Sequence, residues 1–196
     1  MRLFSLLAAV AVLAAATPAS AQLMDVLTAP KTLIDRAIEA RSAADIAKDN
    51  EIVVKINAIM GKLGTIKAST EIYEQRLLIT GIFDDKSLHD RFEREVRQVR
   101  GVKKLYWHVT YLAKNDPKRK GLLEWADVTV MAAKAQARLV GTAGVADVNF
   151  RTTADSYGIV YLLGRARSQE EAAKALTRVR DGDGVRKVVN YVAVRP

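Results

Sequence analysis

Two stretches decide the fold, Ile159-Val160-Tyr161-Leu162-Leu163-Gly164 and Gly184-Val185-Arg186-Lys187-Val188-Val189, and a polar helical segment separates them. An earlier pair, Leu77-Leu78-Ile79-Thr80-Gly81 and Gly101-Val102-Lys103-Lys104-Leu105, has the same arrangement. The glycines lie twenty residues apart in both pairs, at 81 and 101 and at 164 and 184, so the copies are offset by 83. Self-similarity at a fixed shift indicates a duplicated unit. We expect this shift to hold without gaps across the whole unit.

The first copy is predicted to run helix, strand, strand, helix, strand. Asp49 is expected to cap a first helix that Gly61 and Gly64 end. Residues 66–72 alternate between apolar and polar, which predicts a strand with one solvent-facing side. Glu74-Gln75 is the predicted turn into the next strand. Asp84-Asp85 is expected to cap the next helix, and the third strand is expected at 102–111.

The second copy repeats this order. Its first helix is predicted to bury Val128, Met131, Ala135 and Leu139 at helical spacing. A strand with Val148, Phe150 and Thr152 follows, and residues 159–163 form the next strand. Ser168-Gln169-Glu170-Glu171 has the spacing of a capping box. The connector between the copies, residues 113–124, is polar and contains Pro117 and Gly121, so we expect it to be exposed.

The first residues have the three-part layout of a secretory signal. Met1-Arg2 is basic, residues 3–16 are apolar apart from one serine, and Ala19-Ser20-Ala21 offers small residues for cleavage before Gln22. An uncleaved anchor is the alternative. The chain has no cysteine, so we expect neither disulfides nor a lipid anchor after the signal. A leader helix is predicted at 31–41.

Composition is that of a globular protein, with 49% hydrophobic and 27% charged residues among 196. The formal charge is +9, and residues 125–196 contribute +4 from 11 basic and 7 acidic residues. A positive field favours anionic partners. Export makes a membrane surface or an acidic envelope polymer the expected partner, and excludes nucleic acid.

The closing pattern at 184–194, together with Leu162-Leu163-Gly164, resembles the BON domain (bacterial OsmY and nodulation). Asp49 with Ile52, and Asp127 with Val130, are similar to that domain's opening helix. Trp107 stands in the first copy where the second has Asn190.

The resemblance implies an α+β fold of two tandem α-β-β-α-β units, each a three-stranded mixed sheet covered by two helices. The predicted domains are a signal peptide (1–21), a leader helix segment (22–44), a first BON-like domain (45–112), a linker (113–124) and a second BON-like domain (125–196). It also implies a periplasmic, non-enzymatic protein that attaches to phospholipid surfaces and maintains the envelope under osmotic stress.

Basic residues of the linker and second copy are the candidate phospholipid-binding surface, since each Lys or Arg near an anionic leaflet contributes about 1 kcal/mol. A solvated face is the alternative for these charges. Trp125 is expected either to anchor in the membrane interface or to join the core. The candidate residues are Lys118, Arg119, Lys120, Trp125, Arg165, Arg167, Lys174, Arg178 and Arg180.

Other motifs favour ordinary structure. His89 and His108 have no carboxylates at ligand spacing, so no metal is expected. Asp181-Gly182-Asp183-Gly184 lacks the remaining ligands of a calcium loop and is predicted to be a turn. Gly61-Lys62-Leu63-Gly64 and its counterpart at 141–144 fit an RNA-clamping loop, but glycines that end helices explain them. No nucleophile–base pair or phosphate loop is visible, so neither catalysis nor a cofactor is expected.

Two functions therefore remain from the sequence. The first is attachment to anionic phospholipid through the second unit. The second is a periplasmic chaperone-like or adaptor role, in which the leader helix and the apolar strand with Tyr106, Trp107 and Tyr111 contact other envelope proteins.

Overall fold

The computed structural model describes residues 38–64 and 67–196. The predicted signal peptide lies outside the described residues, and so does the leader segment up to residue 37. Residues 38–196 belong to one compact unit. Among the described helices, none combines the length and the apolar character needed to cross a bilayer.

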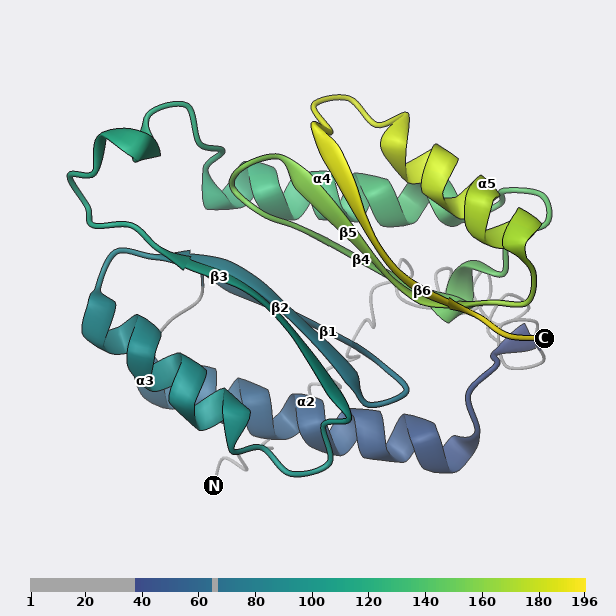
Figure 1. Ribbon diagram of the computed structural model, residues 1–196, viewed down its shortest axis with the longest axis horizontal. Coiled ribbons are helices and arrows are strands. Elements are labelled where there is room, and N and C mark those ends of the chain that lie inside the picture. The colour runs from purple at the N-terminus through teal and green to yellow at the C-terminus, as the bar shows by residue number, and fades with distance from the viewer. Residues whose placement is uncertain (1–37, 65–66) are drawn as a thin grey trace, which may run out of the picture. The chain divides into compact units, whose positions relative to one another are not determined.

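The first repeat contains α2 (Ala43–Leu63), β1 (Ala68–Tyr73), β2 (Arg76–Phe83), α3 (Lys86–Arg97) and β3 (Lys104–Tyr111), in the predicted order (Figure 1). β1 pairs antiparallel with β2, and β2 pairs parallel with β3, so the sheet is mixed. Both helices pack on one face of this sheet, where Ile52, Ile56, Phe92 and Val96 share a buried cluster with Leu77.

The second repeat has the same topology. After a short 3-10 turn, η1 (Pro117–Arg119), come α4 (Trp125–Leu139), a second 3-10 turn, η2 (Asp147–Asn149), and β4 (Phe150–Ala154). β5 (Ile159–Ala166), α5 (Gln169–Arg180) and β6 (Lys187–Val194) complete the unit. The sheet order is β4-β5-β6, again with one antiparallel and one parallel pairing. Val128, Met131, Ala135 and Leu139 are buried in its core, as predicted.

The offset of 83 holds for most of the unit and fails in the first strand. It relates β2 to β5, α3 to α5 and β3 to β6 residue by residue. Gly81 pairs with Ala68, however, whereas Gly164 pairs with Phe150, so the first strands are offset by 82. The second hairpin carries one more residue, and its loop is closed by the bond from Asp155 N to Ile159 O. The expectation of a gap-free repeat was therefore wrong at this hairpin, and Val148 lies in η2 rather than in the strand.

Each middle strand continues past its glycine, because the glycine allows the neighbouring strand to approach closely. A Cβ at Gly81 would lie 2.6 Å from the carbonyl oxygen of Lys67, and one at Gly164 would lie 2.2 Å from that of Asn149. Both distances are shorter than any real contact, so no side chain fits at either position. The glycine that punctuates each apolar run thus marks a close backbone approach within the sheet rather than the end of the strand.

The second face of each sheet packs against the other repeat. Tyr73, Leu78, Tyr161 and Leu163 form a third buried cluster that draws on both sheets. The rings of Tyr106 and Tyr191 stack across this interface, with centroids 3.8 Å apart. The strand side predicted to face solvent is exposed at Lys67 but only partly exposed at Ser69 and Glu71, and Tyr73, the next residue on that side, is fully buried. Strands with both faces covered explain why Leu77, Leu78 and Ile79 are all buried.

Three of the four principal helices (α2, α3 and α5) begin with a side-chain cap, and α4 has none. Asp85 accepts a hydrogen bond from Leu88 N at 3.1 Å, and Ser168 accepts one from Glu171 N at 3.1 Å, both as predicted. Helix α2 differs, because it begins at Ala43 and its cap is Ser42. Asp49 lies inside this helix and is almost completely buried, so the prediction that it caps the helix was wrong.

Candidate functional site

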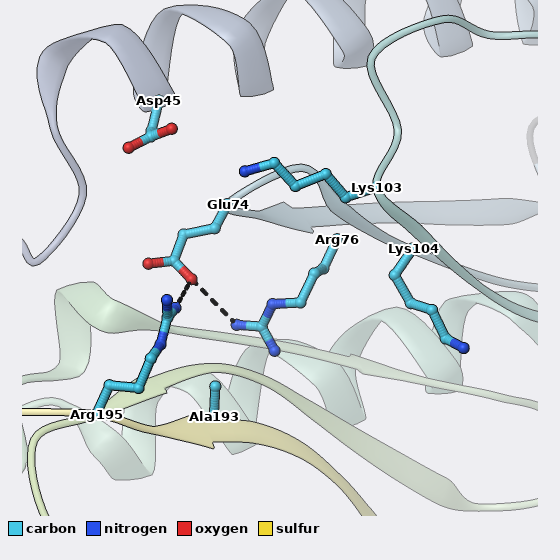
Figure 2. Close-up of a pocket in the computed structure, with 7 residues that line it drawn as sticks. All are labelled: Asp45, Glu74, Arg76, Lys103, Lys104, Ala193 and Arg195. Atoms are coloured by element: carbon cyan, nitrogen blue, oxygen red, sulfur yellow. Dashed lines mark hydrogen bonds and ion pairs between the residues drawn. The ribbon is translucent and has the colours of Figure 1, made fainter.

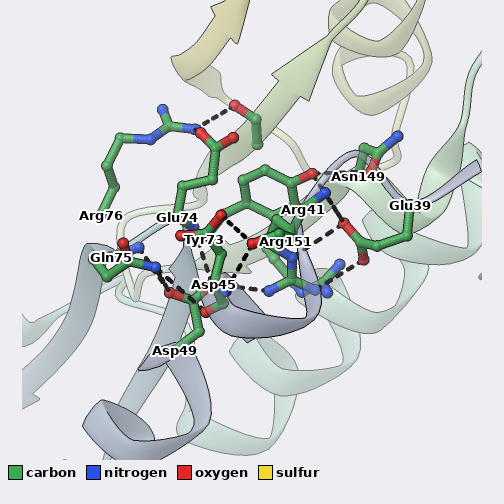
Figure 3. Close-up of polar contacts among 12 residues, drawn as sticks. Glu39, Arg41, Asp45, Asp49, Tyr73, Glu74, Gln75, Arg76, Asn149 and Arg151 are labelled. Atoms are coloured by element: carbon green, nitrogen blue, oxygen red, sulfur yellow. Dashed lines mark hydrogen bonds and ion pairs between the residues drawn. The ribbon is translucent and has the colours of Figure 1, made fainter. Parts of the chain in front are cut away.

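The two-residue turn between β1 and β2 is held by the buried carboxylate of Asp49. Glu74 and Gln75 both have left-handed backbones, with φ of 52° and 61°, which costs non-glycine residues about 1 kcal/mol or more each. Asp49 accepts hydrogen bonds from Glu74 N at 2.9 Å, Gln75 N at 2.7 Å and Gln75 Nε2 at 2.8 Å (Figure 3). Arg41 pairs with the same carboxylate at 2.9 Å. The position of the turn is therefore set by helix α2.

Residues 38–41 connect the two repeats next to this turn. Asn149 of the second repeat accepts from Ala40 N at 2.8 Å and donates to the carbonyl of Ile38 at 2.9 Å. The hydroxyl of Tyr73 donates to Glu39 and to Asn149, at 3.1 and 2.9 Å. Burial, together with the nearby Glu39 carboxylate, raises the pKa of Tyr73, so its phenol stays protonated. These residues were predicted to end the leader helix (31–41), but residues 39–41 are not helical, because their polar groups bond to the two repeats and tie them together.

Glu74 points away from its own sheet and meets three arginines. Arg195 forms an ion pair with it, Arg165 lies 3.7 Å from it and Arg76 lies 3.8 Å from it. Arg76 also crosses to the second repeat, where its two terminal nitrogens donate to the carbonyls of Tyr191 and Gly164 at 2.7 and 2.6 Å. One carboxylate facing three guanidinium groups leaves an excess of positive charge where the repeats meet.

A pocket of about 400 Å³ opens at this point, and we call it the seam pocket. Figure 2 shows Arg76 and Arg195 meeting at Glu74. Lys103, the residue before β3, extends toward the side of Asp45 and Glu74, whereas Lys104, at the start of β3, extends away from Glu74. Four cationic side chains thus surround two acidic ones. The lining residues are Asp45, Glu74, Arg76, Lys103, Lys104, Ala193 and Arg195.

Two buried polar atoms beside the seam pocket have no hydrogen-bond partner among the described residues. They are Oε1 of Gln75 and Nε of Arg76. Buried polar atoms are normally satisfied, and one that is not marks a strained or functional position. The unsatisfied Nε belongs to a guanidinium that lines the pocket.

The outward face of α4 is a second unusual surface, and we call it the α4 face. Small and apolar residues recur along it at helical spacing, and Val140 follows directly after the helix. The residues are Ala126, Val130, Ala133, Ala137 and Val140. Val130 is 51% exposed and Val140 is 46% exposed. Basic side chains lie close by: Lys134 is exposed on α4, and the side chain of Arg178 on α5 donates to Thr142 beyond the end of α4, at 3.4 Å.

The structure brings only some of the predicted candidates to the α4 face. Trp125 begins α4 but is half-buried and packs on the core of the second repeat, which favours its core alternative. Lys174 and Arg178 lie beside the loop that follows α4, since the ammonium of Lys174 is 3.2 Å from where a Cβ of Gly144 would stand. Lys174 also pairs with Glu170 at 2.7 Å.

Of the other candidates, some form hydrogen bonds or ion pairs within the chain, and the rest are exposed side chains outside the α4 face. Arg119 donates to the carbonyls of Leu112 and Phe83, at 2.5 and 3.2 Å, so this part of the linker is anchored to the first repeat. Arg165 lies at the seam, where it contacts Glu74 and the carbonyl of Ala40. Arg167 reaches Glu171 at 3.5 Å. Lys118, Lys120 and Arg180 are exposed.

Two of the three aromatic residues of the third strand that were proposed to contact other proteins pack against rings of this chain. Tyr106 stacks on Tyr191, and Trp107 packs against Phe92 with ring centroids 5.4 Å apart. Tyr111 remains 36% exposed. Within residues 38–64 and 67–196, no three His, Cys, Asp or Glu side chains are grouped as metal ligands would be.

Two titratable side chains are desolvated near the interface between the sheets. Burial raises the pKa of Glu71 to about 7, and Arg151 offsets part of this effect. Burial lowers the pKa of His108, and the charge of Asp155 opposes the shift. The imidazole Nε2 of His108 is hydrogen-bonded to the hydroxyl of Tyr191 at 2.7 Å, and its ring lies 4.4 Å from that of Tyr161.

Comparisons with known proteins give one match to a family model and one relative among curated proteins. The BON domain model matches residues 127–196. A protein of Anaplasma centrale, described as "Uncharacterized protein in gshII 5'region", is 30% identical over 148 residues, which cover 75% of this chain and 95% of that protein.

Solved structures of lower similarity come from Chlamydia trachomatis. CdsD, a structural protein of the Type III secretion system, matches with 14% identity and a TM-score of 0.31, over 74% of this chain and 93% of the other. The C-terminal domain of CdsD matches with 12% identity and a TM-score of 0.32, over 74% and 98% of the two chains.

Proposed function

Because this chain belongs to the same family as the Anaplasma centrale protein, and its residues 127–196 match the BON domain, we propose that it is a non-enzymatic envelope protein that attaches to anionic phospholipid. The attachment surface is the α4 face. The finer elements of the proposal are export by a cleaved signal peptide, a periplasmic location, a second BON-like unit at 45–112, and a role in envelope integrity or osmotic stress tolerance.

The observation that carries the proposal is the exposed apolar stripe on α4, flanked by cations. Val130 is 51% exposed on a helix whose opposite side fills the core of the second repeat, and Val140, the residue that follows this helix, is 46% exposed. A helix with an outward apolar stripe and nearby basic residues suits the boundary between lipid headgroups and acyl chains. Burying apolar area contributes about 25 cal/mol per Å².

Electrostatics favour an anionic surface over a neutral one. Lys134 and Arg178 are exposed beside the stripe, and Asp127 is the acidic residue within α4. Each cation near an anionic leaflet contributes about 1 kcal/mol, and salt screens this attraction. A few cations and a short apolar stripe therefore predict reversible, salt-sensitive attachment rather than insertion.

Vesicle sedimentation tests the proposal, using the mature chain (22–196) at low and high salt. We expect sedimentation with vesicles that contain phosphatidylglycerol, weaker sedimentation at high salt, and little with phosphatidylcholine alone. Val130→Gln combined with Lys134→Glu should abolish most binding. The matched control is Val54→Gln combined with Lys62→Glu, because Val54 is 67% exposed on α2 of the first repeat.

Equal binding by the two double variants would overturn the assignment to the α4 face. Equal recovery in the supernatant with anionic and neutral vesicles would remove lipid attachment altogether. A stoichiometric envelope protein that co-purifies with the chain would then favour the adaptor hypothesis.

A further inference from the structure

The seam pocket is separate from the α4 face. Its lining holds more cationic side chains than acidic ones. We propose that it binds a phosphate group through Lys103, Lys104 and Arg195, beside the fixed guanidinium of Arg76. The proposal goes beyond lipid attachment and does not rest on it, because the seam pocket is built from α2, the β1–β2 turn, β3 and the C-terminal end of the chain.

Glu74 balances only part of the positive charge around it. This carboxylate has Arg76, Arg165 and Arg195 as ion-pair partners, so it neutralises only a third of the arginine charge around it. The ammonium groups of Lys103 and Lys104 add to this excess, and the charge of Lys103 acts on Asp45, whose pKa is lowered by its hydrogen bond with Ser42 and by this lysine. Asp45 is the second acid of the lining. The pocket therefore holds an uncompensated positive charge that favours a multiply charged anion.

The donors differ in mobility, and this difference suits ligand binding. Arg76 is fixed by two carbonyl oxygens of the second repeat and has a buried Nε without a partner. The side chain of Arg195 is 53% exposed, so it can turn from Glu74 toward a ligand. A fixed guanidinium beside mobile cations is a preorganised arrangement that an incoming anion completes.

The chemistry favours phosphate over a single carboxylate. A phosphate dianion is tetrahedral, and its oxygens accept hydrogen bonds from several directions. Guanidinium and ammonium groups that surround it can therefore donate to different oxygens at once. One carboxylate would be balanced by one guanidinium, as Glu74 already is by Arg195. The volume of about 400 Å³ is larger than a phosphate ion, so a phosphate ester fits as well. Its source is either a lipid headgroup or a soluble phosphate ester.

Isothermal titration calorimetry tests the proposal. The mature chain is titrated with inorganic phosphate and with glycerol 3-phosphate, at low salt and neutral pH. We expect saturable binding that weakens as salt is added. Lys103→Gln combined with Lys104→Gln should weaken it by about tenfold or more, because two charge-assisted contacts are lost. The matched control, Lys118→Gln combined with Lys120→Gln, removes two exposed lysines of the linker and should bind like the parent chain.

Glu74→Gln gives a test in the opposite direction. Removing this negative charge frees Arg195 and should tighten phosphate binding several-fold, a gain that misfolding does not produce. Absence of saturable binding by the parent chain would overturn the proposal. So would equal affinities of the two double-lysine variants, or weaker binding by Glu74→Gln in a chain that still unfolds cooperatively.

Vesicles distinguish the two sources of phosphate. The comparison uses the chain that carries Val130→Gln and Lys134→Glu. If the phosphate belongs to a lipid headgroup, this chain should still bind phosphatidylglycerol vesicles weakly, and adding Lys103→Gln and Lys104→Gln should remove that residual binding. A soluble source predicts no such residual binding, while the calorimetric titration stays positive. Because changes on the α4 face affect vesicles and not the titration, failure of lipid attachment is separable from failure of the seam pocket.

Discussion

The carboxylate of Asp49, buried inside helix α2, accepts a 2.7 Å hydrogen bond from the main-chain N–H of Gln75, in the turn between β1 and β2. Two further bonds from the same turn and an ion pair with Arg41 complete its surroundings. Through this contact a helix of the first repeat sets the position of Glu74, which in turn faces the arginines of the second repeat.

Asp49→Ala should destabilise the protein by about 3 kcal/mol, because it leaves buried donors and the Arg41 charge without a partner. Urea unfolding followed by circular dichroism measures this loss. Glu51→Ala on the exposed side of the same helix is the control and should leave the midpoint close to that of the parent. Similar midpoints for the two variants would show that the turn is held by other contacts.

Gly164→Ala should destabilise the second repeat by more than about 3 kcal/mol, because the new Cβ would overlap the carbonyl oxygen of Asn149 and the strand must shift. Gly61→Ala is the contrasting change, since nothing lies within 4 Å of its Cβ. It lies in helix α2, where alanine should stabilise by about 0.5 kcal/mol. Thermal unfolding of both variants checks the opposite signs. A tolerated Gly164→Ala would mean that β4 and β5 are not packed as closely as described.

Acid should weaken the contact between the two sheets through His108. Its pKa is lowered in the folded protein, so the folded state resists a proton that the unfolded state accepts. The stability that neutral His108 contributes is therefore complete above its ordinary pKa of about 6.5 and falls as the pH drops below it. Urea midpoints at about pH 7.5 and pH 5 should differ less for His108→Gln than for the parent chain. Parallel losses in both proteins would exclude this role for His108.

Glu71 should have the opposite dependence. Its pKa is raised from 4.5 to about 7, so its contribution to stability is complete below about pH 4.5 and is lost as the pH rises through 7. Glu71→Gln should therefore unfold like the parent at about pH 4 and be more stable at about pH 8. Glu170→Gln is a suitable control, because Lys174 lowers the pKa of that exposed carboxyl and no gain is expected at high pH. A constant difference between Glu71→Gln and the parent across this range would contradict the assignment.

The predictions that succeeded depend on short stretches of chain. The capping residues Asp85 and Ser168, the turn at Glu74-Gln75 and the buried face of α4 are each encoded within a few residues of where they act. Helical and strand periodicities identify a buried face directly from the sequence. The fixed offset between the copies predicted the repeated element order for the same reason. It did not predict the extra residue of the second hairpin, or the different lengths of the first helices, which have 21 residues in α2 and 15 in α4.

The candidate sites were harder to predict because they depend on what a side chain meets far away in the chain. Arg165 and Arg119 belong to runs of positive charge that look solvent-exposed in sequence, but they bind Glu74 and backbone carbonyls. The seam pocket joins Arg76 and Lys103 to Arg195, which lies more than ninety residues beyond them. No local pattern in the sequence indicates that pairing.

By itself, the sequence determined the two repeats, their element order and the faces that the helices bury, because periodicity and capping are local properties of the chain. Only the tertiary structure decided that the two sheets pack against each other, that Asp49 holds a turn instead of capping a helix, and that the arginines converge on Glu74. These contacts depend on the docking of one repeat on the other, which joins residues separated by most of the chain and leaves no spacing pattern to read.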